Sequence, residues 1–159
     1  MVDIVDTVTR SRMMAGIKSR NTKPELIIRS LLHRNGFRFR LHVKNLPGKP
    51  DIVLSKYKTV IFIHGCFWHG HEHCRLFKLP GTRIEFWKKK IYRNKEHDSK
   101  VIELLLLKHW RVCVIWECRI RQDKKDLSQV INIISNFIRG SAPYIELRGN
   151  TFKTLKIKG

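Results

Sequence analysis

Apolar residues recur at helical spacing in three segments of the chain. The first follows Thr22-Lys23-Pro24-Glu25, where a threonine cap, an early proline and a glutamate three residues after the cap are typical of a helix start. The second covers residues 85–109, with a break expected near Asn94, and the third follows Asp126 as a capping residue. Each segment therefore has one apolar face to bury.

Shorter apolar runs between these segments predict strands. Residues 37–43 alternate between apolar and basic side chains, as a half-buried strand does. Residues 51–54 and 59–63 are joined by a polar turn and predict a hairpin, and residues 110–118 predict a further buried strand, whereas the tail after Ser141 has little pattern. This order of elements predicts an α/β fold with a mixed central sheet flanked by helices.

Length and charge narrow the class of protein. A chain of 159 residues fits one domain, here taken as residues 21–140. We expect a basic N-terminal arm at 1–20, which contacts DNA, and a C-terminal tail at 141–159. The 42% of hydrophobic residues exclude a disordered basic tail. The net charge of +20 favours nucleic acid as the partner. No apolar run is long enough to span a bilayer and no basic anchor helix is evident, so no membrane partner is expected.

The N-terminus carries two acidic residues and no apolar segment of the kind found in a secretory signal. We therefore expect the protein to work in the cytosol. In that compartment four cysteines favour metal binding or free thiols over disulfides.

The densest chemistry lies between residues 64 and 74, where four histidines and two cysteines occur. Zinc prefers thiolate and imidazole ligands in a tetrahedron. Cys66, Cys74, one histidine between them and the distant Cys118 would complete a structural site of three cysteines and one histidine. The alternative is a histidine-rich surface loop with reduced thiols, and the spacing favours the zinc site. Cys113, inside an apolar run, is expected to be a buried free thiol.

A site with three cysteines uses at most one of these histidines, so the others are available for chemistry. His64 and His69 are candidates for acid or base catalysis at a phosphate, because the imidazole pKa lies near working pH. Phe67 and Trp68, adjacent in a polar loop flanked by glycine, are candidates to stack on bases or to wedge between them. Trp87, followed by three lysines, has the same candidate role, and a buried anchoring tryptophan is the equal alternative.

Two carboxylates complete the list of candidates. Asp51 stands at the head of the predicted hairpin, where many nucleases place an aspartate that binds Mg²⁺. The next strand, residues 60–64, has neither the carboxylate nor the lysine of the usual nuclease motif, so that motif is incomplete. Glu25, three residues after Thr22, is expected to cap its own helix rather than to bind a ligand.

Taken together, these residues resemble one family, the very-short-patch repair (Vsr) DNA mismatch endonucleases. The resemblance extends from about residue 10 to residue 120, and its most specific part is the run His-Gly-Cys-Phe-Trp-His followed later by Trp-Glu-Cys. The matching stretches are residues 10–14, 21–25, 46–51, 60–69, 82–87, 94–98 and 110–118.

The resemblance implies a restriction-endonuclease-like fold of the PD-(D/E)XK type with a structural zinc site. It implies an enzyme that nicks one DNA strand 5′ to the T of a T:G mismatch left by deamination of 5-methylcytosine, by Mg²⁺-dependent phosphodiester hydrolysis, and so starts very-short-patch repair. Wedging at a T:G pair costs less than at a normal step because the wobble pair stacks and pairs less well. The implied setting is the bacterial cytoplasm, at the nucleoid, with MutL as a candidate partner. A monomer is expected, since a single-strand nick needs one active site.

The resemblance also assigns roles at the catalytic site. Two Mg²⁺ ions are implied, with Asp51 and the main-chain carbonyl of Ile63 as ligands; a backbone oxygen there would explain the incomplete motif. His69 would be the general base. Three residues would orient groups or bound waters around it, namely His64, Glu25 and Asp98.

One structural zinc ion and a DNA wedge are implied as well. The zinc ligands would be Cys66, His71, Cys74 and Cys118, with His73 as the alternative to His71. The side chains that enter the duplex beside the mismatch would be Met14, Phe67, Trp68 and Trp87.

Two other functions stay open. A non-catalytic, zinc-stabilised DNA-binding module would need the same charge and aromatic residues, but it would have no reason to pair Asp51 with His69. A restriction-type endonuclease of the same fold would cut unmodified duplex, because a fold does not fix a function. A comparison of T:G with T:A duplexes separates this last function from mismatch repair.

Overall fold

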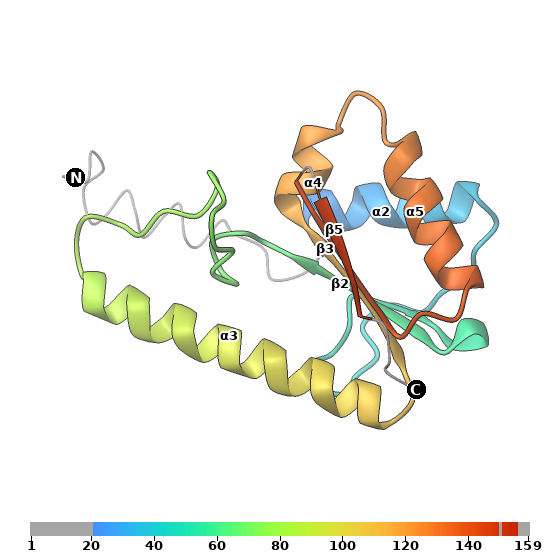
Figure 1. The fold of residues 1–159 in the computed structure, drawn as a ribbon, viewed down its shortest axis with the longest axis horizontal. Helices are drawn as coiled ribbons and strands as arrows, with labels where there is room; N and C mark the ends of the chain where they lie inside the picture. The colour runs from blue at the N-terminus through green and yellow to red at the C-terminus, as the bar shows by residue number, and fades with distance from the viewer. Residues whose placement is uncertain (1–20, 150, 156–159) are drawn as a thin grey trace.

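A five-stranded mixed sheet forms the centre of the protein in the computed structural model, which describes residues 21–149 and 151–155 (Figure 1). Its strands lie in the order β1 (Ile52–Leu54), β2 (Thr59–His64), β3 (Arg111–Trp116), β4 (Tyr144–Arg148) and β5 (Thr151–Leu155). β2, β3 and β4 are parallel, and an antiparallel strand pairs at each edge. The predicted hairpin is confirmed as β1 and β2, joined by the short 3-10 helix η1 (Ser55–Tyr57).

Helices cover both faces of this sheet. α2 (Lys23–Arg34) and α5 (Ser128–Arg139) lie on one face, and α3 (Ile84–Leu107) lies on the other, while the short α4 (Glu117–Gln122) follows β3 directly (Figure 1). β2 is buried at all of its positions, because strands with helices on both faces have no side that meets water. The prediction of a mixed sheet flanked by helices is therefore confirmed. Among the described residues, no helix is long and apolar enough to cross a membrane.

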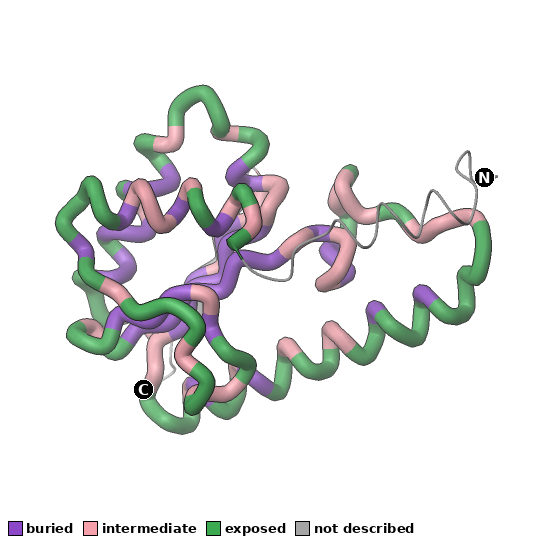
Figure 2. Tube along the Cα trace, turned by 180° about the vertical axis from the view of Figure 1, so that it is seen from behind, coloured by how far each residue is buried: buried purple, intermediate pink, exposed green. Residues whose placement is uncertain are grey.

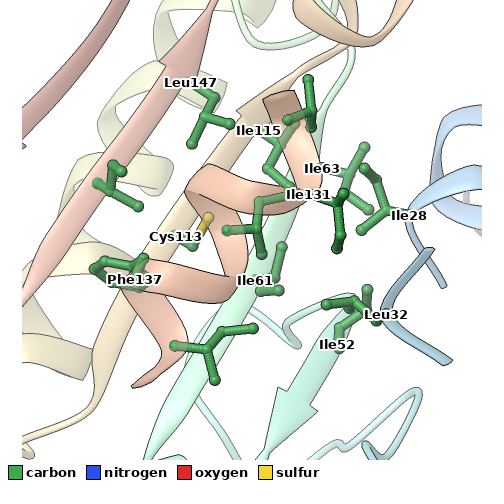
Figure 3. Close-up of a cluster of buried hydrophobic side chains, with 14 of the residues drawn as sticks. Ile28, Leu32, Ile52, Ile61, Ile63, Cys113, Ile115, Ile131, Phe137 and Leu147 are labelled. Atoms are coloured by element: carbon green, nitrogen blue, oxygen red, sulfur yellow. The ribbon is translucent and has the colours of Figure 1, made fainter. Parts of the chain in front are cut away.

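The core is divided into two clusters by the alternation of side chains along the strands. Ile61 and Ile115 point into the cluster under α2 and α5, together with Ile28 and Ile131 from those helices (Figure 3). Phe62 and Val114, one position along each strand, point to the opposite cluster, which α3 closes. This period of two is the geometric consequence of the extended backbone.

Arg111, at the start of β3, ties the end of α5 to the sheet. Its guanidinium donates hydrogen bonds to the carbonyl oxygens of Ile138 and Ala142, both at 2.9 Å, and to that of Phe137. The Phe137 carbonyl also accepts the N–H of Gly140 at 3.2 Å, whereas the carbonyls of Ile138 and Ala142 lie at and beyond the end of α5, where the helix supplies no further amide. A single side chain therefore caps the helix and fixes its position on the sheet.

Three expectations about secondary structure are wrong. The tail after Ser141 contributes β4 and β5 to the sheet; only Ile145 and Leu147 alternate as buried apolar residues in β4, which is too short a pattern to stand out in a sequence. Residues 37–43 pair at one point only, Arg40 with Val53, because β1 is just three residues long and offers no longer edge. α3 runs for 24 residues without a break at Asn94.

α3 is the longest element, and only a few of its residues are buried. Figure 2 shows the helix exposed along most of its length, with its N-terminal half extending away from the sheet. Its buried residues are Trp87, Ile91, Val101 and Leu105. The last two pack on the sheet and the first two face the loop that follows β2, so this loop is held between β2 and α3.

Candidate active site and metal centre

A cavity of about 620 Å³ opens where β1 and β2 meet the first turn of α2 and the middle of α3. Five candidate residues from separate parts of the chain line this cavity. They come from the start of α2, the residue before β1, the end of β2, the loop after β2 and the middle of α3, and they are Glu25, Asp51, His64, His69 and Asp98. The structure thus brings together all of the catalytic candidates that the sequence suggested.

Asp51 is the carboxylate whose surroundings most strongly disfavour its charge. Its Oδ2 accepts a hydrogen bond of 2.7 Å from the main-chain N–H of Ile63. Burial raises the pKa of Asp51 from 3.8 to about 6, and the nearby charge of Glu25 acts in the same direction, against the lowering effect of the Ile63 amide. A cation at this position would therefore relieve an unfavourable charge.

Glu25 is almost fully buried, and it caps α2 as the sequence predicts. Its Oε2 accepts hydrogen bonds from the N–H of Asn21 at 2.9 Å and from the Arg29 guanidinium at 3.0 Å. Its Oε1 accepts the hydroxyl of Thr22 at 3.2 Å. The capping box is incomplete, because the Thr22 hydroxyl donates to Glu25 and makes no bond to the free amides of the helix. Glu25 combines this capping role with a position at the rim of the cavity.

His69 and Asp98 form a hydrogen-bonded pair of histidine and carboxylate. The Nδ1 atom of His69 lies 2.6 Å from Oδ2 of Asp98, so the carboxylate holds one ring nitrogen and leaves Nε2 as the other site for a proton. Asp98 reaches the loop from α3, where its side chain is part of the cavity wall. This is the arrangement by which a carboxylate fixes the tautomer and orientation of a catalytic histidine.

His64 stacks on His69, with ring centroids 3.9 Å apart and planes within 5° of parallel. Burial lowers the pKa of His64 to about 3, and the neighbouring His69 adds to that effect, so His64 is neutral at working pH. Its Nδ1 is buried and has no hydrogen-bond partner among the described residues. The ligand atoms of His64, His69 and Asp98 lie within 4.8 Å of one another. However, the in-plane lone pairs of two parallel stacked rings do not converge on one ion, which favours proton transfer over metal binding for this group.

The cavity wall also contains residues for which the sequence suggested no role. His97, adjacent to Asp98, and Glu117, adjacent to Cys118, both line it, as does Lys49. All three stand inside stretches that carry the family resemblance. No spacing rule separates them from their neighbours, so that resemblance is the one signal that could have found them.

The second group of functional candidates joins the loop after β2 to the first turn of α4. The ligand atoms of Cys66, His71, Cys74 and Cys118 all lie within 4.8 Å of one another. The structure therefore favours His71 over His73, which does not belong to this group of described residues. Three sulfur atoms and one imidazole nitrogen are the donor set of a structural zinc site, so the residues fit that ion.

Local backbone geometry holds this loop in place. Gly70 has a φ of 60°, and a Cβ at this position would lie 2.5 Å from the Ile91 side chain on α3. The glycine thus permits both a left-handed conformation and a close approach to the helix. Because Gly70 lies between His69 and His71, the same contact positions a catalytic and a metal-ligating candidate.

The thiols of the metal group differ in their acidity. A hydrogen bond with Cys66 lowers the pKa of Cys118 to about 5, with further contributions from the N–H of Gly149 at 3.4 Å and from His71. The same hydrogen bond and burial raise the pKa of Cys66. Deprotonation is thus favoured at Cys118 and disfavoured at Cys66, and a divalent cation on both sulfurs would displace the remaining proton.

The aromatic candidates form one cluster beside the cavity. The ring centroid of Phe67 lies 5.1 Å from that of Trp68 and 5.4 Å from that of Trp87, and Lys90 lies over the Trp68 ring. Phe67 and Trp68 are half-buried, whereas Trp87 is buried on α3 and supports the other two. The anchoring alternative therefore describes Trp87 in this structure. Met14 lies outside the described residues.

Comparison with known proteins assigns the family. A sequence model described as "DNA mismatch endonuclease Vsr" matches residues 2–76. The chain is 48% identical over 125 residues to the DNA mismatch endonuclease Vsr of Escherichia coli (strain K12), which covers 79% of this chain and 80% of that protein. The chain belongs to the Vsr family of DNA mismatch endonucleases.

Two further relatives are named as nicking enzymes. The type II nicking enzyme V.XorIIP of Xanthomonas oryzae is 46% identical over 120 residues, covering 76% of this chain and 88% of the relative. The type II nicking enzyme V.NmeAIP of Neisseria meningitidis is 48% identical over 121 residues, covering 76% and 86%. Membership in the family makes the protein a DNA endonuclease.

Proposed function

We propose that this endonuclease nicks one strand of duplex DNA 5′ to the T of a T:G mismatch by Mg²⁺-dependent hydrolysis, and so starts very-short-patch repair. The observation that carries the proposal is the convergence of Asp51 with the His69–Asp98 pair on one cavity. A domain that only binds DNA has no use for a buried carboxylate next to a carboxylate-oriented histidine. The proposal includes a restriction-endonuclease-like fold for the mixed sheet.

The residues of the cavity fit magnesium. Asp51 is a buried carboxylate with a raised pKa, and Mg²⁺ prefers oxygen ligands. Asp51 and the main-chain carbonyl of Ile63 would hold the metal, with two ions in the complete site. When bound, magnesium would neutralise phosphate charge and lower the pKa of water.

His69 is the general base in this proposal. Asp98 accepts a hydrogen bond from the Nδ1–H of His69, so Nε2 is the nitrogen that takes a proton from the attacking water. The neutral His64 stacks on the same ring and restricts its tilt without adding a second positive charge. Glu25 sits across the cavity and orients water at its rim.

The metal group would hold in place the loop that carries His69. We propose that Cys66, His71, Cys74 and Cys118 hold one structural zinc ion. The ion would fix the loop that carries His69, since three of the four ligands flank that histidine within the same loop.

Phe67 and Trp68 are the proposed wedge, with Trp87 as their support and Met14 acting from the arm. A T:G pair is easier to unstack than a normal pair, so insertion there gives discrimination. The net charge of +20 supplies phosphate contacts, which give affinity and register but no discrimination. The proposed setting is a monomer at the bacterial nucleoid, with MutL as a partner.

A strand-resolved cleavage assay tests the proposal. Labelled duplexes with one T:G pair in several flanking contexts are incubated with and without Mg²⁺, beside matched T:A duplexes. We expect a Mg²⁺-dependent nick beside the mismatched T, lost in Asp51→Ala and kept in Glu103→Ala, which removes an exposed carboxylate of α3. Binding without a nick would favour the DNA-binding module, and equal cleavage of T:A would favour the restriction-type enzyme.

A further inference from the structure

The polar residues of β4 line one cavity together with the catalytic histidines. Its buried apolar residues, Ile145 and Leu147, belong to the core under α2 and α5. The alternate residues Tyr144, Glu146 and Arg148 therefore project from the other face of the sheet. These three residues lie beyond the part of the chain that the family model matches.

Glu146 receives two hydrogen bonds from this region. Its Oε1 accepts the indole N–H of Trp116 at 2.7 Å, and its Oε2 accepts the hydroxyl of Tyr144 at 3.2 Å. Trp116 ends β3 and is 9% exposed, so its N–H has little access to water. A hydrogen bond to a carboxylate is about twice as strong as a neutral one, and the Glu146 side chain therefore fixes the plane of the indole.

The Trp116 ring contacts both the metal group and the catalytic histidines. One face stacks on His71 of the metal group, with centroids 4.0 Å apart and planes within 8°. The His64 ring meets the indole at 77° with centroids 5.2 Å apart, and the His69 ring lies at 78° and 6.4 Å. A tilt of the indole would therefore change the support of the stacked histidine pair.

The space around the Trp116 ring makes the histidine pair sensitive to it. A cavity of about 240 Å³ separates the histidines and Asp98 from β4, and its wall includes Trp116 and Glu146. This cavity is open to solvent, so the side chains that line it lack packed neighbours on that side. With such a space beside it, the histidine pair has room to shift if Trp116 no longer holds its position.

We propose that Glu146 is a positioning residue for catalysis, which acts by holding the Trp116 indole against the His64–His69 pair. The inference rests on the proposed function, because it concerns the same catalytic histidines. It adds a contribution from β4, a strand that carries none of the candidate catalytic or metal-ligating residues. A misplacement of about 1 Å can cost a factor of about a hundred in rate, so loss of one supporting hydrogen bond should cost about tenfold in kcat.

Three variants test this role under single-turnover and steady-state conditions. Glu146→Ala removes the acceptor together with the 3.7 Å ion pair to Arg148, whose Nε also donates to His71, so zinc content is measured beside the rate. Glu146→Gln keeps an amide oxygen in place of the acceptor, and Tyr144→Phe removes only the second hydrogen bond to the same carboxylate. We expect Glu146→Ala to lower kcat about tenfold with unchanged Kd for the T:G duplex and unchanged zinc content. Glu146→Gln should recover most of the rate, and Tyr144→Phe should match the wild type.

A double-mutant cycle separates this role from general stability. In a Trp116→Phe background the indole donor is gone, so Glu146→Ala should have no further effect on kcat. The proposal is overturned by an additive loss in that background, by an unchanged kcat in Glu146→Ala, or by failure of the glutamine variant to recover. It is also overturned if the lower kcat comes with loss of zinc, because the effect would then act through the metal group.

A spectroscopic readout is independent of nicking. In a proton–nitrogen correlation spectrum, the indole N–H signal of Trp116 is identified by its absence in Trp116→Phe. We expect that signal to move upfield in Glu146→Ala and to stay near its original position in Glu146→Gln. An unmoved signal would contradict the hydrogen bond itself. If the wild type does not nick any T:G duplex, the proposed function fails while this spectrum still reports on the contact.

Discussion

Replacement of Asp51 by asparagine should stabilise the magnesium-free protein while abolishing nicking. The pKa of Asp51 is raised from 3.8 to about 6 in the folded protein, mainly by burial. A carboxyl group with a raised pKa contributes its full stability below pH 4 and loses that contribution as the pH rises through 6. With 1.36 kcal/mol per pKa unit, the ionised side chain costs up to about 3 kcal/mol of unfolding free energy at pH 8. Asparagine has no charge, and its amide oxygen can still accept the Ile63 N–H.

Urea unfolding followed by circular dichroism measures this difference. In magnesium-free buffer without chelator at pH 8, Asp51→Asn should be more stable than the wild type by about 1–3 kcal/mol, and near pH 5 the gain should fall to about half. Asp123→Asn is the matched control: its carboxylate pairs with Arg119 at 2.8 Å, so this variant should lose stability. Added Mg²⁺ should stabilise the wild type and Asp123→Asn but not Asp51→Asn. Equal or lower stability of Asp51→Asn at pH 8 would refute the argument that Asp51 is held at an electrostatic cost.

Three further predictions concern the framework of the site. Arg111→Met should lower the unfolding free energy by about 2–4 kcal/mol, since it removes the guanidinium hydrogen bonds to the carbonyls of Ile138 and Ala142, whereas the exposed Arg121→Met should change it by less than about 0.5 kcal/mol. Gly70→Ala should cost at least about 1 kcal/mol in urea unfolding and speed zinc release to a chromogenic chelator, because φ is 60° and the new Cβ would meet Ile91; an unchanged release rate would contradict this. Cys118→Ser should reduce zinc content, measured by atomic absorption, and a full complement of zinc in this variant would remove Cys118 from the ligand set.

Much of the fold follows from local patterns in the sequence. α2 and α5 have apolar residues at helical spacing, and β2 and β3 are short runs rich in β-branched and aromatic residues, so each can be predicted without its neighbours. β4 is visible only through its pairing with β3, because two buried apolar residues in five do not make a pattern. Strand pairing between distant segments is decided by the whole sheet, which no window of sequence contains.

In the site, too, some features could be predicted from local sequence and others depend on contacts between distant segments. His64, His69 and Asp98 could be selected from the sequence by their chemistry and by the family resemblance. The preference for His71 over His73 rests on the resemblance alone, and its geometric reason appears only in the structure, where the His71 ring meets Cys118 after the chain has returned through α3 and β3. The contact between Trp116 and Glu146 also joins residues on different strands, so it is invisible until β4 is placed.

The position of Cys118 has a topological consequence. With a metal ion on the four ligands, the stretch from Cys74 to Cys118 becomes a closed ring that contains all of α3 and β3. A closed ring has fewer conformations available than an open chain of the same length. When the exposed N-terminal half of α3 unfolds within such a ring, the chain therefore gains less conformational entropy than it would with free ends. Amide exchange along the helix should therefore report on metal occupancy many residues away from the ligands. The longest and most exposed helix would depend for its persistence on a bond that none of its own residues makes.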